Sequence, residues 1–128
     1  MTKAKLILVL AIFALLLGGC KSSDYDKAVQ SYENKEYSEA ITSLNELGDY
    51  KDSKQLLVKV IEADVSEHLN TDDGENVVTL ISSYEYAYQD EKDGYKKLIL
   101  DSFKKLIEKK DYKNARALYE LPVYFNQR

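Results

Sequence analysis

Residues 25–47 read YDKAVQSYENKEYSEAITSLNEL, and the spacing of their apolar residues decides the fold. Four residues of the first part recur at the i, i+3, i+4, i+7 spacing of one helix face: Tyr25, Ala28, Val29 and Tyr32. The second part repeats much the same spacing from Tyr37 onward, and Gly48 follows it as a C-terminal stop. The stretch therefore predicts two consecutive helices, over about residues 25–34 and 37–47.

The helical periodicity continues along the chain, without a strand-like alternation of any length. Turn residues gather at 70–74 and 90–94. Between and beyond these turns, four more helices are predicted, over about residues 50–69, 75–89, 95–109 and 111–120. The 50–69 helix is apolar over more than half of its circumference, so we expect it to be central and covered on more than one side. The sequence predicts an all-α fold of about six short helices in antiparallel pairs, as an array or a small bundle.

The N-terminal residues have a different composition. Lys3 and Lys5 precede an unbroken run of twelve apolar residues, 6–17, which is followed by Gly18-Gly19-Cys20. A charged start, a short apolar run and small residues before a cut are typical of a secretory signal peptide. The alternative is an uncleaved transmembrane anchor. It is disfavoured because twelve helical residues span about 18 Å, against roughly 30 Å of hydrocarbon core.

Leu17-Gly18-Gly19-Cys20 resembles the lipobox of bacterial lipoproteins, and the resemblance covers residues 3–20. It implies that a diacylglyceryl group is joined to the Cys20 sulfur, and that the signal is cut so that Cys20 becomes the first residue. Cys20 is the only cysteine, so no internal disulfide is possible. We expect a protein held on the cell membrane by its lipid and facing outside the cytoplasm. The expected parts are a signal peptide (1–19), the lipidated cysteine with a short tether (20–24) and a helical domain (25–128).

The charge of the mature chain excludes some partners. Residues 1–19 hold two lysines and no acids, so the rest has 16 basic and 22 acidic residues, a net charge of −6. Nucleic acid binding depends on clustered positive charge, and so does lying flat on an anionic membrane. Neither partner is expected, and the lipid on Cys20 is the expected membrane contact.

A motif of an acid, a tyrosine, a polar residue, Asp, Asn or Glu, and a small residue begins at positions 36, 49 and 111. It predicts a helix start, with the acid near the positive end of the helix dipole. Together with Ala28 and Tyr32, residues 35–41 resemble the helix A, turn, helix B pattern of tetratricopeptide repeats. The resemblance covers about residues 25–57 and 98–119 and implies a tetratricopeptide-like array. Because the motif does not keep the family's period, a small bundle stays open.

Motifs for catalysis or for a cofactor do not occur. His68 is the only histidine, and it lies within the apolar arc of the 50–69 helix. We interpret it as a packed, hydrogen-bonded side chain, although a cleft that pairs His68 with a carboxylate would favour an enzyme. Neither Gly74 nor Gly94 aligns with the glycine of a calcium-binding EF-hand loop, and no zinc or phosphate-binding motif is present. We therefore expect no enzyme activity, no metal and no cofactor.

Tyrosine is unusually frequent, with 11 residues. Most lie at core spacing, but Tyr86 falls opposite the apolar face of the 75–89 helix. An outward tyrosine is either an isolated surface residue or a contact for a partner, because tyrosine is enriched at interfaces. Tyr124 and Phe125 are a second candidate contact on the same reasoning.

The expected function is a lipid-anchored, extracytoplasmic protein–protein interaction module of the bacterial cell envelope, whose partner is another envelope protein. The alternative is a small-ligand-binding lipoprotein that serves a transporter. A deep apolar pocket would favour this alternative.

Overall fold

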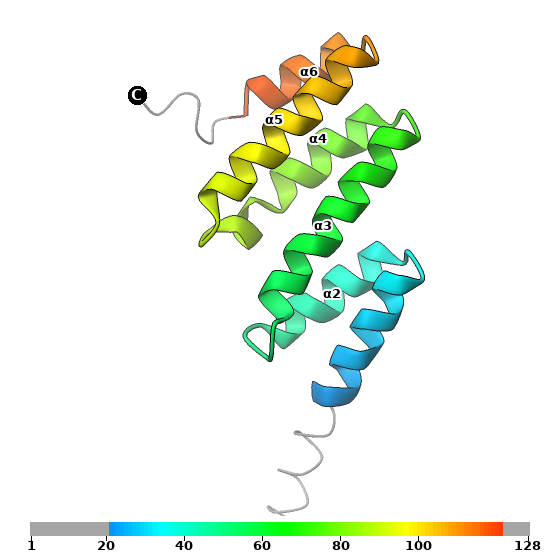
Figure 1. Cartoon of the computed structure of the whole chain (residues 1–128), viewed down its shortest axis with the longest axis vertical. Coiled ribbons are helices and arrows are strands. Elements are labelled where there is room, and N and C mark those ends of the chain that lie inside the picture. The colour runs from blue at the N-terminus through cyan, green and yellow to red at the C-terminus, as the bar shows by residue number, and fades with distance from the viewer. Residues whose placement is uncertain (1–20, 122–128) are drawn as a thin grey trace, which may run out of the picture. The chain divides into compact units, whose positions relative to one another are not determined.

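The computed structural model describes residues 21–121, which fold almost entirely into helices (Figure 1). A helical segment over residues 21–33 comes first and includes 21–24, the stretch expected as a tether. The elements that follow are α2 (Tyr37–Leu47), α3 (Ser53–Asn70), α4 (Gly74–Ser83), the 3₁₀ helix η1 (Glu85–Tyr88), α5 (Lys92–Glu108) and α6 (Tyr112–Tyr119). Residues 21–121 contain no strand, which confirms the predicted all-α class. Within this range, no helix combines the length and the apolar character needed to cross a membrane.

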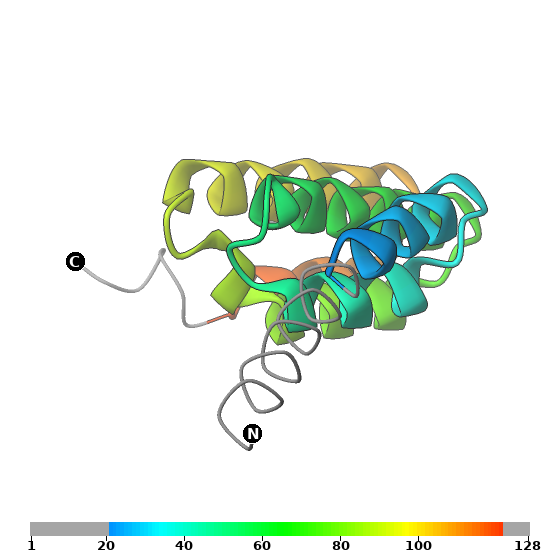
Figure 2. The same ribbon diagram turned by 90° about the horizontal axis from the view of Figure 1, so that it is seen from below.

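Contacts divide the chain into two units, one ending at Leu57 and the other beginning at Val58, inside α3. The first unit holds helix 21–33 and α2. In the second unit, α4 packs against α5 and α6, and η1 packs against α4 and α5. Figure 2 shows this second unit with α5 in one layer and with α4 and α6 in the other.

Residues 21–121 form three helix–turn–helix hairpins: helix 21–33 with α2, α3 with α4, and α5 with α6. Their turns share one backbone conformation. The residue before each second helix's N-cap has a left-handed backbone, with φ 63° at Lys35, 57° at Asp72 and 61° at Lys110. The N-cap residues that follow have ψ values of 66°, 63° and 69°, in the order Glu36, Asp73 and Asp111. The backbone N–H of each cap donates to the carbonyl oxygen five residues back, at 2.8–2.9 Å. This hydrogen bond closes the first helix in the way a Schellman motif does.

Because the three turns match, the hairpins can be aligned residue by residue. Their N-caps lie at Glu36, Asp73 and Asp111, so equivalent positions are separated by 37 and then 38 residues. Four residues after each cap comes a buried small or β-branched residue, in the order Ala40, Val77 and Ala115. Residues 21–121 thus form three equivalent antiparallel helix pairs, which agrees with the predicted pairing.

Gly74 occupies the position that a tyrosine holds in the other two hairpins. A Cβ atom added there would lie 2.1 Å from Oδ2 of Asp111 and 2.8 Å from Nδ2 of Asn114. Asp111 is the N-cap of α6, so the start of α6 packs directly on the backbone of Gly74. A side chain at position 74 would displace the Asp111 cap, so glycine lets the third hairpin pack this closely on the second.

The motif at Asp49 is not a helix start, which corrects the prediction for this copy. Residues 48–52 instead form the link between α2 and α3, with left-handed backbones at Gly48 and Lys51. The Tyr50 ring packs edge-on against the Tyr25 ring at a centroid distance of 6.1 Å. Asp52 accepts a hydrogen bond from the Tyr25 hydroxyl. Tyr50 and Asp52 of the motif therefore pack the link between α2 and α3 against helix 21–33.

The predicted 75–89 helix is also wrong, because the chain breaks at Tyr84 into α4 and η1. Near this break, the hydroxyl of Thr79 donates to the carbonyl of Glu75, and that of Ser82 to the carbonyl of Thr79. Such bonds bend and weaken a helix end. The predicted 90–94 turn is shorter than expected, since α5 already begins at Lys92.

Candidate functional site

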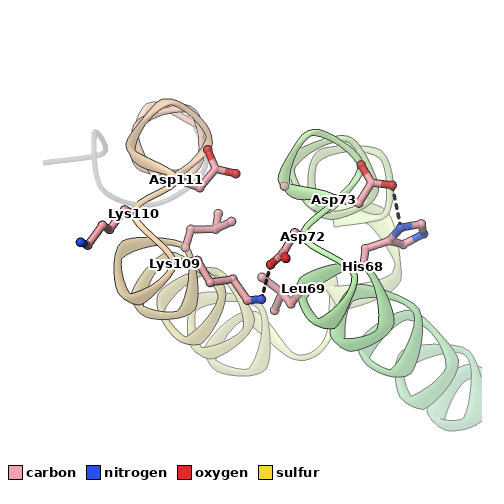
Figure 3. Close-up of a pocket in the computed structure, with 9 residues that line it drawn as sticks. His68, Leu69, Asp72, Asp73, Lys109, Lys110 and Asp111 are labelled. Atoms are coloured by element: carbon pink, nitrogen blue, oxygen red, sulfur yellow. Dashed lines mark hydrogen bonds and ion pairs between the residues drawn. The ribbon is translucent and has the colours of Figure 1, made fainter.

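A hollow of about 460 Å³ lies between the turns of the second and third hairpins (Figure 3). Its lining includes two apolar side chains, Leu69 and Leu106, and otherwise consists of charged or polar residues and Gly74. The side chains of Asp72 and Lys109 form an ion pair that joins the two turns.

The acids of the hollow are already engaged in holding the helices. Asp73 accepts from the side-chain amide of Asn76 at 2.6 Å and from its backbone N–H at 3.4 Å. These bonds to Asn76 are the main reason why the pKa of Asp73 is lowered. Asp111 accepts in the same way from Asn114 at the start of α6. Both carboxylates therefore act first as helix caps.

His68 lines this hollow and lies between two carboxylates. Its Nδ1 is 3.1 Å from Oδ2 of Asp73, and its Nε2 is 3.2 Å from Oδ1 of Asp64. Asp64 is a buried acid, and burial raises its pKa while the contact with His68 opposes the rise. The imidazole joins α3 to the cap of α4.

A pairing of His68 with a carboxylate is the arrangement that would favour an enzyme, but here both ring nitrogens are engaged. A general base needs one nitrogen with an available lone pair. The geometry thus fits the interpretation of a packed, hydrogen-bonded histidine. The charged rim also differs from the deep apolar pocket expected of a small-ligand receptor.

A second hollow, of about 530 Å³, surrounds the tyrosine singled out from the sequence. Glu85, Tyr86, Gln89 and Lys92 line it. The Tyr86 side chain is 46% exposed, and its ring packs against that of Tyr84 at a centroid distance of 6.1 Å. An outward aromatic ring flanked by an acid, an amide and a lysine can offer both apolar contact and polar bonds to a protein surface.

The other residues predicted for partner binding and for lipidation, Tyr124, Phe125 and Cys20, lie outside the described residues. Tyr86 has the exposure that the sequence predicts, although on η1 and not on a long α-helix. Its role as a partner contact stays a prediction.

Sequence reasoning missed an exposed apolar surface at the C-terminal end of the second unit. Four large side chains there are exposed: Leu100, Ile107, Tyr112 and Tyr119. In the sequence they have the same helical spacing as core residues. No signal in the sequence distinguishes them, because the 37–38-residue register aligns Ile107 and Tyr119 with buried residues of the second hairpin.

Residues 21–121 contain no group of three or more His, Cys, Asp or Glu side chains that could hold a metal ion. No protein-family model, no curated protein and no solved structure matches the chain.

Proposed function

We propose that the protein is a lipoprotein of the bacterial cell envelope, anchored through Cys20, and that its helical domain binds another envelope protein outside the cytoplasm. The observation that carries this proposal is the run from Lys3 to Cys20, with its positive start, its twelve apolar residues and its Gly-Gly-Cys end. A lipid with two acyl chains holds a protein stably, at about 0.8 kcal/mol per buried methylene group. The anchor would thus supply the membrane contact that the acidic domain lacks.

Binding of a protein is the role that best suits the domain. It consists of antiparallel helix pairs, and the engaged nitrogens of His68 favour a structural role for the one histidine. The hollow around Tyr86 holds an exposed aromatic ring of a residue type that is enriched at protein interfaces, and Glu85 and Lys92 beside it resemble the polar rim of such an interface.

The anchor is tested by the intact mass of the native protein extracted from membranes with detergent. A mass that begins at Cys20 and includes a diacylglyceryl group supports the proposal. A mass that retains Met1 contradicts the lipoprotein part.

The binding surface is tested by placing a photoreactive amino acid at position 86 in cells that carry the full chain. We expect one discrete cross-linked product in the membrane fraction, identified by mass spectrometry as an envelope protein. Position 113 serves as the matched control, because Lys113 is an exposed residue of α6 outside the hollow. Equal products from both positions, or none from position 86, contradict Tyr86 as the contact.

A further inference from the structure

The register of the three hairpins shows that the last one exposes positions that the others bury. Leu44, Ile81 and Tyr119 occupy equivalent places, eight residues after their respective caps. Their side chains are 1%, 0% and 62% exposed. The position is thus a core position in the first two hairpins and a surface position in the third.

The first helix of the last hairpin repeats this contrast. Phe103 and Ile107 of α5 are equivalent to Val65 and Leu69 of α3, at a separation of 38 residues. Val65 is buried, whereas Phe103 is only partly covered; Leu69 is 9% exposed, whereas Ile107 is 40% exposed. Leu100, one turn before Phe103, is also exposed.

We call these four residues the terminal face: Leu100, Phe103, Ile107 and Tyr119. The two helices join there, since the rings of Phe103 and Tyr119 lie 6.4 Å apart between centroids. A terminal unit of a helical array that faces water ordinarily carries polar residues at such positions. Covering apolar surface is favourable by about 25 cal/mol per Å², so a contiguous apolar face of this kind indicates an occupant.

We infer that the occupant is the chain's own C-terminal segment, and that Val123, Tyr124 and Phe125 pack on the terminal face. Because α6 ends at Tyr119, beside Phe103, the chain leaves the helix at this face. Leu121, the last described residue, is already partly covered. Four extended residues reach about 13–14 Å at 3.3–3.6 Å each. Phe125 can therefore reach Leu100, which lies about one turn further along the antiparallel α5.

The composition of residues 122–127 suits packing on the terminal face. Residues 122–127 carry no charged side chain, and three consecutive residues among them are large and apolar. A segment joined directly to the face has an effective concentration of the order of millimolar. It therefore competes well against a second copy or a partner at micromolar concentration. The inference is independent of the lipid anchor and of the hollow around Tyr86.

Cross-linking of the full chain in detergent tests the inference. In a Cys20→Ser background, Leu100→Cys is combined with Phe125→Cys and treated with a short bis-maleimide. We expect a fast cross-link within the monomer. The matched control replaces Leu100→Cys by Asp101→Cys, because Asp101 lies at the same level of α5 but about 100° around it. That pair should react several-fold more slowly.

Thermal unfolding gives a second measurement that does not need the cysteine variants. Phe125→Ala should lower the melting temperature by about 4 °C or more, whereas Asn126→Ala should leave it unchanged. The shift from Phe125→Ala should disappear when Leu100→Ala is already present. Equal cross-linking rates for the two pairs, or additive shifts, overturn the inference. A cross-link that forms mainly between chains and rises with protein concentration also overturns it, and assigns the terminal face to a second copy.

Discussion

The rings of Tyr88 and Tyr95 pack together with their centroids 5.2 Å apart, but their hydroxyl groups have different surroundings. The Tyr95 hydroxyl donates a 2.8 Å hydrogen bond to the carbonyl oxygen of Ile81. The buried Tyr88 hydroxyl makes no well-formed hydrogen bond within the described residues, although the Glu62 carboxylate lies close enough to interact with it. Burial raises the pKa of Tyr88, and the negative charge of Glu62 and its polar contact with the hydroxyl raise it further, so this phenol stays protonated.

The same substitution should therefore have opposite effects at these two positions. Tyr88→Phe removes a buried hydroxyl that lacks a well-formed hydrogen bond, and it should raise the free energy of unfolding by up to about 1 kcal/mol. Tyr95→Phe removes a buried hydrogen bond and should lower it by about 1 kcal/mol. Urea unfolding followed by circular dichroism measures both. A loss of stability in both variants would show that the Tyr88 hydroxyl has a partner in solution.

Gly74 and Gly94 form a second matched pair, since both lie in the first turn of a helix. Gly74→Ala forces the side chain of Asp111 away from its cap position, and loss of a cap costs about 0.5–2 kcal/mol. At Gly94, the nearest atom to an added Cβ is Oε2 at the flexible end of the Glu91 side chain, at 3.3 Å, and the Glu91 Cβ and the Tyr88 ring lie at ordinary contact distances. Gly94→Ala should therefore stabilise by about 0.5–1 kcal/mol, through the better helix propensity of alanine.

Melting temperatures of the two glycine variants check this prediction. Hydrogen exchange of the α6 amides should also rise in Gly74→Ala and stay unchanged in Gly94→Ala. If Gly74→Ala melts higher than the parent chain, then α6 does not pack on Gly74 in solution.

The left-handed turn residues Lys35 and Lys110 offer a third test. Glycine adopts a positive φ without strain, so Lys35→Gly and Lys110→Gly should each stabilise by roughly 0.5–1 kcal/mol. Because the two turns belong to different units of the chain and are far apart in the sequence, their effects should add. Lys104→Gly, in the interior of α5, is the control and should destabilise by about 1 kcal/mol. Destabilisation by the turn variants would contradict the left-handed conformation.

The acids on either side of His68 should respond oppositely to pH. Burial raises the folded-state pKa of Asp64, so the folded chain binds the proton more tightly than the unfolded chain does. Its contribution to stability is therefore complete below the unfolded pKa of about 3.9 and is lost as the pH rises through the folded value. Asp64→Asn should accordingly stabilise at pH 7 and have little effect at pH 3.

The pH dependence of stability through Asp73 should have the opposite sign to that through Asp64, because Asn76 lowers the pKa of Asp73. The contribution of Asp73 to the free energy of unfolding is present above its unfolded pKa and is lost as the pH falls through its folded pKa. Asp73→Asn should thus destabilise at pH 7, with a difference that shrinks in strong acid. Urea unfolding of both variants at the two pH values checks the pair. Destabilisation by Asp64→Asn at pH 7 would mean that attraction to His68 outweighs the burial of the carboxylate.

Local patterns in the sequence predicted what local interactions determine. The bounds of α2 agree with the apolar spacing from Tyr37 and the stop at Gly48, since both signals lie within the helix itself. The break at Tyr84 was missed because the apolar spacing continues through it. The apolar periodicity of a helix carries no information about side-chain hydrogen bonds such as those of the Thr79 and Ser82 hydroxyls to backbone carbonyls.

The repeat register was missed for a related reason. The second hairpin carries Gly74 where the motif has a tyrosine, and the reason for that glycine is the contact with Asp111, 37 residues later. The copy at Asp49 looked equivalent in sequence but serves as a link. Exposure of Tyr119 could not be predicted either, because helical spacing does not reveal whether another layer follows.

The three hairpin turns also bear on the order in which the protein assembles. Each turn closes through a backbone bond between residues only five apart, so each needs nothing beyond its own stretch of chain. A polypeptide delivered from its N-terminal end, as in export across a membrane, can form its hairpins one after another. The backbone of Gly74 then has no partner until Asp111 emerges, so the last hairpin docks only after the first two have formed.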